Sequence, residues 1–387
     1  MIVSLALIVL ASMPRGDDAK PGREVRVSTI AELRAAIAEA KPGGAILIAP
    51  GEYPGGLSIR ELKGEADRPI RLKGEDPAHP PRFTGGSFAM QLSQVSYVEL
   101  HDLTVVGASD NGINIDDGGI LDKPSHHLLL RGLTVQDIGP RGNHDGIKLS
   151  GIADFRVEDC TLIRWGEGGS GIDMVGCRRG EIVGSLFQHG DQKGSNSVQS
   201  KGGSEEITVR RCRFEHAGER AVNLGGSTGL AFFRPRPQGF EARKITVEDC
   251  TFIGSMAPFA FVGVDGATVR FNTIYRPARW IMRILQENRE PGFVSSRNGV
   301  FENNLIAFRS DELAVPMNVG DATSPETFRF ARNAWFCIDN PSRSRPELPV
   351  AEVESVYGED PQFEDAEAGK LTLKPTSPVS FAGVRPR

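Results

Sequence analysis

The chain has 387 residues, 39% of them hydrophobic, and a formal net charge of −5 at neutral pH. This apolar content excludes an intrinsically disordered chain, and the lack of a global positive charge argues against nucleic acid as a partner. The 45 glycines and 25 prolines indicate a turn-rich β protein that can form one long domain.

Residues 1–20 predict a signal peptide region ahead of the folded domain. Ile2 to Ala11 form an apolar run that ends in small residues, as the hydrophobic region of a signal peptide does, although no basic residue precedes it. An ordinary hydrophobic strand or helix is the alternative. No later stretch approaches the roughly 20 apolar residues of a transmembrane helix. We therefore expect a secreted or periplasmic protein without a membrane span, in which residues 21–387 form a single domain.

Residues 28–39 predict a short helix. The segment opens with a serine and a threonine, which both favour the N-cap position, and its apolar residues recur at helical spacing. We expect an amphipathic helix whose apolar side packs against the β structure that follows.

From residue 98 onward, one kind of segment recurs at intervals of 22 to 38 residues. Examples are 98–105, 157–162, 209–214, 247–252, 269–274 and 301–306. When aligned, they place these residues at one equivalent inward position: Leu103, Leu133, Cys160, Ser185, Cys212, Cys250, Asn272 and Asn304. Such a recurrence indicates a solenoid with one coil per repeat. The longest interval contains residues 226–244, which we expect to form a loop.

The five cysteines show no Cys-x-x-Cys spacing, and one is left over if the others pair. They are therefore not expected to bind zinc or to form a disulfide framework. Cys160, Cys212 and Cys250 occupy the inward position of the repeats, where a free thiol behaves as a small hydrophobic group.

A second kind of segment lies between the first and alternates apolar with polar residues. Its members are 111–116, 145–150, 170–175, 196–201, 220–225 and 280–285. The alternation predicts strands with one buried and one exposed face. Two strands per coil over about eight coils predict a parallel β-helix, in which each coil buries its apolar face against its neighbours.

The two ends of the chain carry a resemblance to a known family. Residues 40–53 resemble the opening of secreted pectate-lyase-like β-helix proteins, and residues 360–363 and 371–379 resemble their closing segment. The pattern is most similar to the alginate and chondroitin lyase family. The resemblance implies an all-β fold, a right-handed parallel β-helix. The helix at 28–39 would cap its N-terminal end, and residues 357–384 would form an irregular closing coil.

The exposed positions of the alternating strands fall into three columns, in which stacked neighbours lie about 4.8 Å apart. The central column contains Asn114, Lys148, Asp173, Gln199, Asn223 and Arg283. The preceding column contains Asn111, Asp145, Ser170, Asn196 and Arg220, and the following one contains Asp116, Ser150, Val175 and Lys201. This concentration of polar groups predicts a polysaccharide groove between about Asn111 and Arg283, flanked by His144, His189 and His216.

A uronate lyase removes the proton next to a carboxylate, so it needs a base, a group that neutralises the carboxylate and a donor for the leaving oxygen. The resemblance implies that Lys201, on the strand 196–201, matches the family's base and that an arginine on the next coil is its acid partner. Arg220 takes that place here, although the family's arginine lies near the end of its strand, where Gly225 and Gly226 stand. The expected contacts to an acidic polysaccharide are Lys148, Asp173, Gln199, Asn223, Arg283, His144 and Asn196.

The family's calcium-binding carboxylates lie just before the base, where Gly194 and Asn196 stand in this chain. We therefore expect no metal ligands, and calcium stays open as an alternative. Without calcium, the substrate carboxylate would be neutralised by one of four side chains: Arg220, Arg283, Gln199 or Asn223.

Three other functions stay open. Asp145 and Asp173 could serve as the two carboxylates of a glycoside hydrolase. An epimerase would share the proton abstraction of a lyase. A non-enzymatic carbohydrate-binding protein would need exposed aromatic side chains, but only Trp165 and Trp280 among the tryptophans and tyrosines lie near the ladder. This scarcity favours polar recognition of an acidic glycan by Lys, Arg, Asn and Gln.

Several candidate residues also have structural interpretations. Asp173 could pair with Lys148 across neighbouring coils. In the expected loop, Phe232, Phe233 and Arg234 could form the wall of a sugar site or pack the loop onto the coils.

Overall fold

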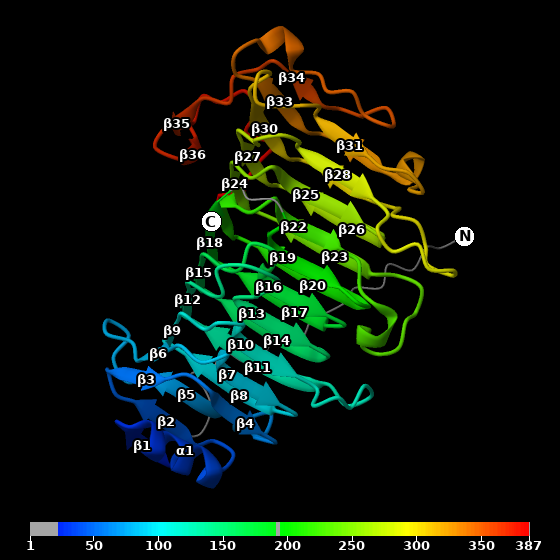
Figure 1. The fold of residues 1–387 in the computed structure, drawn as a ribbon. Coiled ribbons are helices and arrows are strands. Elements are labelled where there is room, and N and C mark those ends of the chain that lie inside the picture. Colours follow the sequence, from blue (N-terminus) through cyan, green and yellow to red (C-terminus); the bar gives the residue numbers. More distant parts are fainter. Residues whose placement is uncertain (1–21, 191–193, 387) are drawn as a thin grey trace, which may run out of the picture.

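The computed structural model describes residues 22–190 and 194–386, which wind into a right-handed parallel β-helix (Figure 1). Within these ranges, three long parallel sheets, here named A, B and C, form the faces of the helix. Sheet A contains β1 (Glu24–Val27), β2 (Ala45–Ile48), β5 (Ile70–Gly74), β8 (Ser96–His101), β11 (Ser125–Arg131), β14 (Ile152–Glu158), β17 (Arg178–Val183), β20 (Ser204–Arg210), β23 (Ala242–Glu248), β26 (Val264–Arg270), β29 (Val300–Glu302) and β32 (Arg329–Ala331).

Sheet B contains β3 (Glu52–Pro54), β6 (Arg82–Thr84), β9 (Thr104–Val106), β12 (Thr134–Gln136), β15 (Thr161–Ile163), β18 (Leu186–Gly190), β21 (Arg213–Ala217), β24 (Thr251–Ile253), β27 (Thr273–Tyr275), β30 (Leu305–Phe308), β33 (Ala334–Cys337) and β34 (Val356–Tyr357). Sheet C contains β4 (Leu57–Arg60), β7 (Phe88–Ser93), β10 (Asn111–Asp116), β13 (Ile147–Ser150), β16 (Ser170–Val175), β19 (Asn196–Lys201), β22 (Arg220–Gly225), β25 (Ala257–Val262), β28 (Met282–Leu285) and β31 (Met317–Val319). Outside these sheets lie α1 (Ile30–Glu39), the 3₁₀ helices η1 (Leu230–Phe232), η2 (Pro325–Thr327) and η3 (Pro341–Arg343), and the antiparallel pair β35 (Phe363–Asp365) and β36 (Lys370–Leu373).

The prediction of two strands per coil is wrong, because complete coils of the described chain have three. The segment 98–105, for example, spans the end of β8 and the start of β9, and Asp102 lies between them at φ 53°. One left-handed residue turns the chain here without interrupting the run of strand-forming residues. The same corner recurs at Asp159, Arg211 and Asp249. The stack also exceeds the predicted eight coils, because sheets A and B each have 12 strands in the described ranges.

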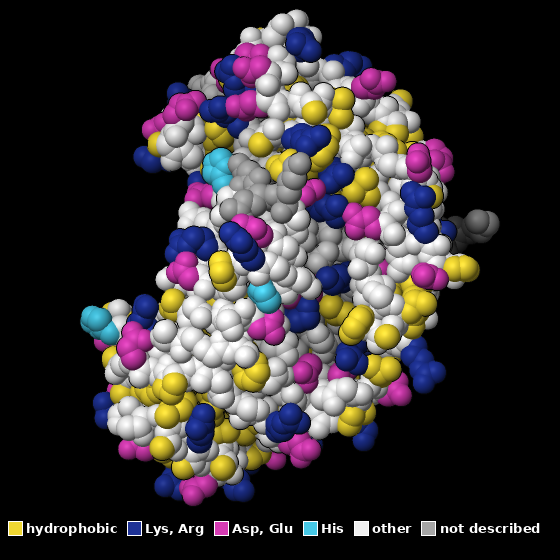
Figure 2. All heavy atoms as spheres, viewed as in Figure 1, with side chains coloured by type: hydrophobic (Ala, Val, Ile, Leu, Met, Phe, Trp, Pro, Cys, Tyr) yellow, Lys and Arg dark blue, Asp and Glu magenta, His cyan; other side chains and the backbone are white. Residues whose placement is uncertain are grey.

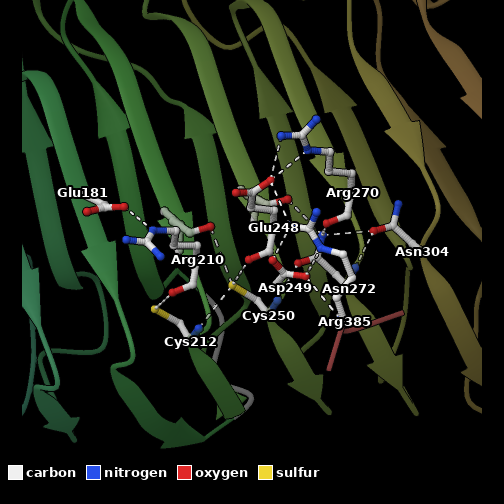
Figure 3. A network of polar contacts seen from close by, with 12 residues as sticks. Glu181, Arg210, Cys212, Glu248, Asp249, Cys250, Arg270, Asn272, Asn304 and Arg385 are labelled. Carbon is white, nitrogen blue, oxygen red and sulfur yellow. Dashed lines mark hydrogen bonds and ion pairs between the residues drawn. The ribbon is translucent and has the colours of Figure 1, made fainter. Parts of the chain in front are cut away.

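The predicted inward ladder is confirmed, since all of its aligned residues are buried. Its side chains bond from coil to coil (Figure 3). The Cys212 N–H donates to Cys250 Sγ (3.4 Å), and the Cys250 N–H donates to Asn272 Oδ1 (2.9 Å). The Asn272 N–H donates in turn to Asn304 Oδ1 (3.0 Å). The ladder therefore satisfies backbone donors that the corner would otherwise leave unpaired in the core.

The N-terminal helix is confirmed as a cap. The Thr29 hydroxyl accepts a hydrogen bond from the Glu32 N–H, and the Glu32 carboxylate accepts one from the Thr29 N–H, both at 3.2 Å. This capping box fixes the start of α1, and Leu33 is fully buried. Helix α1 lies beside β1 and β2 at the N-terminal end of the stack (Figure 1).

The C-terminal segment, residues 357–384, is only partly the irregular closing coil that its sequence predicts. It contains the antiparallel pair β35 and β36, whose register shifts between Phe363 and Asp365. Beyond it the chain returns along the outside of sheet B, where the Arg385 guanidinium pairs with the carboxylate of Asp249 (Figures 1 and 3). The end of the chain therefore lies against the side of the stack.

The expected signal peptide, residues 1–20, lies outside the described residues. Within residues 22–190 and 194–386, no helix is long and apolar enough to cross a membrane. Export of the protein stays a prediction.

Candidate active site on sheet C

The polar ladder on the outer face of sheet C has the predicted register. Strand pairing places the central column on successive coils in the order Asn114, Lys148, Asp173, Gln199, Asn223 and, after Ala260 of β25, Arg283. In the preceding column, Asn196 pairs with Ser170 on one side and Arg220 on the other. Lys201 lies in the following column beside Val175. Lys and Arg side chains, with acidic ones among them, are visible along the middle of this face (Figure 2).

Two lysines and two aspartates form a cluster on β13, β16 and the residues around them. Lys148 Nζ lies 2.9 Å from Asp145 Oδ2 and 2.6 Å from Asp173 Oδ2. Lys201 Nζ lies 3.2 Å from Asp173 Oδ1 and donates to Gln199 Oε1 at 2.9 Å. Both aspartates are fully buried, whereas the Lys148 and Lys201 side chains are 24% and 16% exposed. A ligand from outside would therefore meet the lysines, and the predicted Lys148–Asp173 pair is present beneath them.

Burial and mutual contact give the two aspartates different pKa values. Burial and the neighbouring Asp173 raise the pKa of Asp145 to about 6. Burial also disfavours the charged form of Asp173, but the ammonium groups of Lys201 and Lys148 outweigh it and lower its pKa. For Lys148, burial is outweighed by the two carboxylates, so its pKa is raised. Asp173 thus stays ionised between two lysines, and Asp145 titrates in mildly acidic solution.

Two arginines form the other end of the ladder, and each is paired across the apolar coil of β25. Arg220 Nη2 donates to Glu287 Oε1 at 2.7 Å, and Arg283 Nη1 donates to Glu219 Oε1 at 2.8 Å. Both arginine side chains are about 15% exposed. Burial and the charge of Arg220 lower the pKa of Arg283. The two guanidinium groups therefore lie on this part of the face, and each is balanced by a glutamate carboxylate.

Asn223 presents an unused donor between the two charged clusters. The residue is 1% exposed, and its Nδ2 has no hydrogen-bond partner among the described residues. Its Oδ1 accepts from Arg220 Nη1 at 3.3 Å. The next side chain in the column is Ala260, which cannot accept a hydrogen bond. Leaving such a group unpaired costs roughly 1–3 kcal/mol, so this point of the ladder favours an oxygen atom of a ligand or of water.

The flanking histidines have different surroundings. His144 lies at the edge of the ladder, where its Nδ1 is 2.9 Å from Asp110 Oδ1. His189 instead stacks on the buried Trp165, with the ring centroids 4.4 Å apart. Burial lowers the pKa of His189 to about 4, so this imidazole stays neutral. His144 is therefore the better placed of the two to contact a ligand in the groove.

The loop after β22 lies beside Lys201 and ends earlier than its sequence predicts, because β23 begins at Ala242. We name residues 226–241 the strap. Phe233 and Arg234 pack inward, as expected if they hold the loop on the coils. Phe232 is 68% exposed, as expected for a side chain in the wall of a sugar site. No repeat or motif marks Glu241 at the end of the strap, which the structure shows to be fully buried.

The described residues around Lys201 do not fit a calcium ion. Within the described ranges, no group of three or more His, Cys, Asp or Glu side chains could hold a metal. The carboxylates nearest to Lys201 and Lys148, those of Asp173 and Asp145, are held by lysine ammonium groups. Cationic side chains are therefore the groups on this face that could neutralise a substrate carboxylate.

Comparison with known proteins finds no matching family model and no matching curated sequence. Solved structures do match. An alginate lyase from Paenibacillus sp. str. FPU-7 has a TM-score of 0.55 at 16% identity, over 78% of this chain and 99% of that one. Pectate lyase Pel9A has a TM-score of 0.62 at 13% identity, over 95% and 93%. The A-module of the Azotobacter vinelandii mannuronan C-5 epimerase AlgE4 has a TM-score of 0.54 at 14% identity, over 88% and 92%. These similarities establish the pectate-lyase-like parallel β-helix fold.

Proposed function

We propose that the protein is a secreted or periplasmic polysaccharide lyase that cleaves an acidic, uronate-containing polysaccharide by β-elimination. The observation that carries the proposal is the sheet C ladder, where partly exposed Lys201, Arg220 and Arg283 surround buried amides. Proteins of similar fold include an alginate lyase and a pectate lyase. A polymer of this kind is degraded outside the cytoplasm, which agrees with the signal peptide that residues 1–20 predict.

In this mechanism Lys201 is the base. Its Nζ takes the proton next to the uronate carboxylate, the electrons of that bond form the new carbon–carbon double bond, and the glycosidic oxygen leaves from the adjacent carbon. Arg220, one coil further on, donates a hydrogen bond to the leaving oxygen, which takes up a proton from water. Arg283, with the Gln199 and Asn223 amides, binds the carboxylate and stabilises the charge that develops there.

Lys148 allows Lys201 to act as a base. If Asp173 had no other partner, loss of the Lys201 proton would leave a buried, unpaired carboxylate, which is costly. Lys148 already neutralises Asp173, at 2.6 Å, whereas Lys201 lies at the longer distance of 3.2 Å. Lys148 is therefore a positioning residue that keeps the carboxylate paired through the reaction.

The test follows the ultraviolet absorbance of the unsaturated uronate product on alginate, pectate, chondroitin and ulvan. Lys201→Ala should lower kcat by about 10²–10⁴-fold, the usual contribution of a general base. Lys201→Arg should be equally impaired, because it keeps the charge beside Asp173 but cannot lose its proton. The control is Lys244→Ala, which removes a 64% exposed lysine from sheet A. Wild-type activity of Lys201→Arg would contradict the proposal.

Epimerisation is the second candidate, because the AlgE4 A-module shares the fold with a TM-score of 0.54. An epimerase would abstract the same proton and return one to the opposite face without breaking the glycosidic bond. Incorporation of deuterium from heavy water into the polymer, with no unsaturated product, would identify this reaction. Hydrolysis through Asp145 and Asp173 is not favoured, because both carboxylates are fully buried beneath Lys148.

A further inference from the structure

The strap, residues 226–241, crosses the corner that leads from sheet C to sheet A. Glycines at this corner leave room for it. A Cβ atom at Gly176 would lie 2.0 Å from the carbonyl oxygen of Arg234, and one at Gly151 would lie 3.1 Å from Arg234 Cδ. Arg234 Nε reaches the buried Asp117 carboxylate at 3.4 Å. The strap is therefore fitted to the surface of several earlier coils.

Glu241 fixes the strap to the coil that carries the proposed base. Its fully buried carboxylate accepts hydrogen bonds from the Thr228 N–H (2.8 Å) and the Thr228 hydroxyl (2.7 Å). It also accepts from Asn288 Nδ2 (2.7 Å) and from the N–H of Gly202 (2.9 Å), the residue that follows Lys201. These bonds hold the start and the end of the strap in one place.

The anchored strap nevertheless turns apolar side chains outward. Phe233 is 1% exposed and packs edge-on against Phe293, with the ring centroids 5.4 Å apart. In η1, by contrast, Phe232 is 68% exposed and Leu230 is 46% exposed. The neighbouring phenylalanine packs the strap down, whereas the Phe232 ring lies over Gly229 of its own turn with most of its surface exposed.

The start of the strap, from which the exposed turn continues, lies next to Lys201. A Cβ atom at Gly226 would lie 3.1 Å from Lys201 Cβ, and one at Gly202 would lie 3.3 Å from Thr228 Cγ2. The Phe232 N–H donates to the carbonyl of Gly229, the residue after Thr228, at 2.8 Å. Phe232 is thus connected, through Gly229 and Thr228, to the residues that contact the end of β19. Hydrophobic side chains are visible on this side of the face, where the loop after β22 runs (Figures 1 and 2).

We propose that Phe232 is a stacking platform for a pyranose ring of the polysaccharide, in a subsite on the strap outside the ladder. The ladder offers charges and amides, which bind carboxylates and hydroxyls but not the apolar face of a sugar. An exposed aromatic ring on the anchored strap supplies that contact, and Leu230 lies in the same turn. The proposal rests on the proposed function for the class of ligand, an acidic polysaccharide. It makes Phe232 a determinant of which polymer is bound.

The test compares Phe232→Ala with Phe381→Ala, which removes a 41% exposed phenylalanine from the C-terminal segment. Affinity electrophoresis in alginate and pectate gels measures binding, and product absorbance gives KM and kcat. Phe232→Ala should raise KM and weaken retardation roughly three- to tenfold, with little change in kcat or in melting temperature. Phe232→Tyr should retain wild-type values, because it keeps the ring.

The outcomes separate this subsite from the reaction. If the wild type binds a polymer without making an unsaturated product and Phe232→Ala weakens that binding, the platform stands and the lyase reaction is wrong. If the wild type cleaves and Phe232→Ala has an unchanged KM, the platform is wrong and the reaction stands. Gel filtration tests whether Phe232 instead contacts a second copy of the chain. If the wild type self-associates and Phe232→Ala abolishes this association, the ring belongs to an interface between copies and the proposed subsite is wrong.

Discussion

The outer faces of sheets A and C share the same stacking of about 4.8 Å between coils, but they use charged residues in opposite ways. On sheet A, arginines and glutamates pair directly across neighbouring coils. Examples are Arg71–Glu99, Arg156–Glu181, Glu181–Arg210, Glu205–Arg243, Glu248–Arg270 and Glu302–Arg329. Figure 3 shows two of these pairs on the outside of the inward ladder. These partners keep contact with water, so pairing adds little free energy but leaves little charge unbalanced.

On sheet C the acidic partners of the two lysines are withdrawn from solvent, whereas the two arginines keep partly exposed glutamate partners. Asp145 and Asp173 are fully buried, and the cations above them are not. In the same column, the Asn223 Nδ2 has no hydrogen-bond partner among residues 22–190 and 194–386. Arrangements of this kind cost stability and are typical of sites that bind or transform a ligand. The stacking of side chains in columns is therefore the same on both faces and does not by itself indicate a site. The burial of one partner of an ion pair is what distinguishes the candidate site from a stabilising surface pair.

The largest expected effect is the loss of the buried carboxylate between the two lysines. Asp173→Asn should lower the free energy of unfolding by about 3–5 kcal/mol, because it leaves buried ammonium charge without its partner. The matched control on sheet A is Glu181→Gln, since Glu181 also lies between two cations but is 28% exposed. That control should cost about 1 kcal/mol or less. Equal losses in urea unfolding would remove the distinction between the two faces.

The pH dependence of stability sharpens the comparison through Asp145. Its pKa is raised to about 6 in the folded state, so its protonated form is favoured by folding. The contribution is fully present below the unfolded pKa and is lost as the pH rises through about 6. The stability of the wild type relative to Asp145→Asn should therefore fall by roughly 2–3 kcal/mol between about pH 4 and 7.

Urea unfolding of both proteins across this range measures the pH effect. Glu205→Gln is the control, because Glu205 is the partner of Arg243 on sheet A and is partly exposed. A wild type that gains stability over Asp145→Asn as the pH rises would contradict the assignment of a raised pKa.

The smallest expected effect is on a sheet A pair. Glu248→Arg alone should cost roughly 0.5–1 kcal/mol, since Arg270 is 40% exposed and the pair is screened by solvent. The double variant with Arg270→Glu should recover part of this loss, because the pair is restored in reverse while the new arginine faces Arg385, which lies 3.6 Å from Glu248. A double-mutant cycle in thermal unfolding measures the coupling. A swap that remains as damaging as the single change would show that sheet A also requires a fixed direction of charge.

The sequence alone determined the repeat, the inward ladder and the three outward columns. Residues such as Cys250 and Asn272, or Lys148 and Asp173, lie one coil apart, and the side-chain period of a strand fixes which face each one occupies. The one-residue corner at Asp102 was not predicted, because a single left-handed residue does not interrupt a strand-like sequence pattern. The third strand of each coil was missed for that reason.

Only the tertiary structure decided what the columns do. It placed both lysines above Asp173 and brought Glu241 of the strap to the residue after Lys201. It also left the Asn223 donor without a partner in the part of the chain that the structure describes. Local periodicity predicts the direction in which a side chain points, but it does not predict how deeply that side chain is buried. Burial depends on loops that bring together residues with no common spacing in the sequence. The repeat therefore predicts neither the burial of a carboxylate nor the path of the strap.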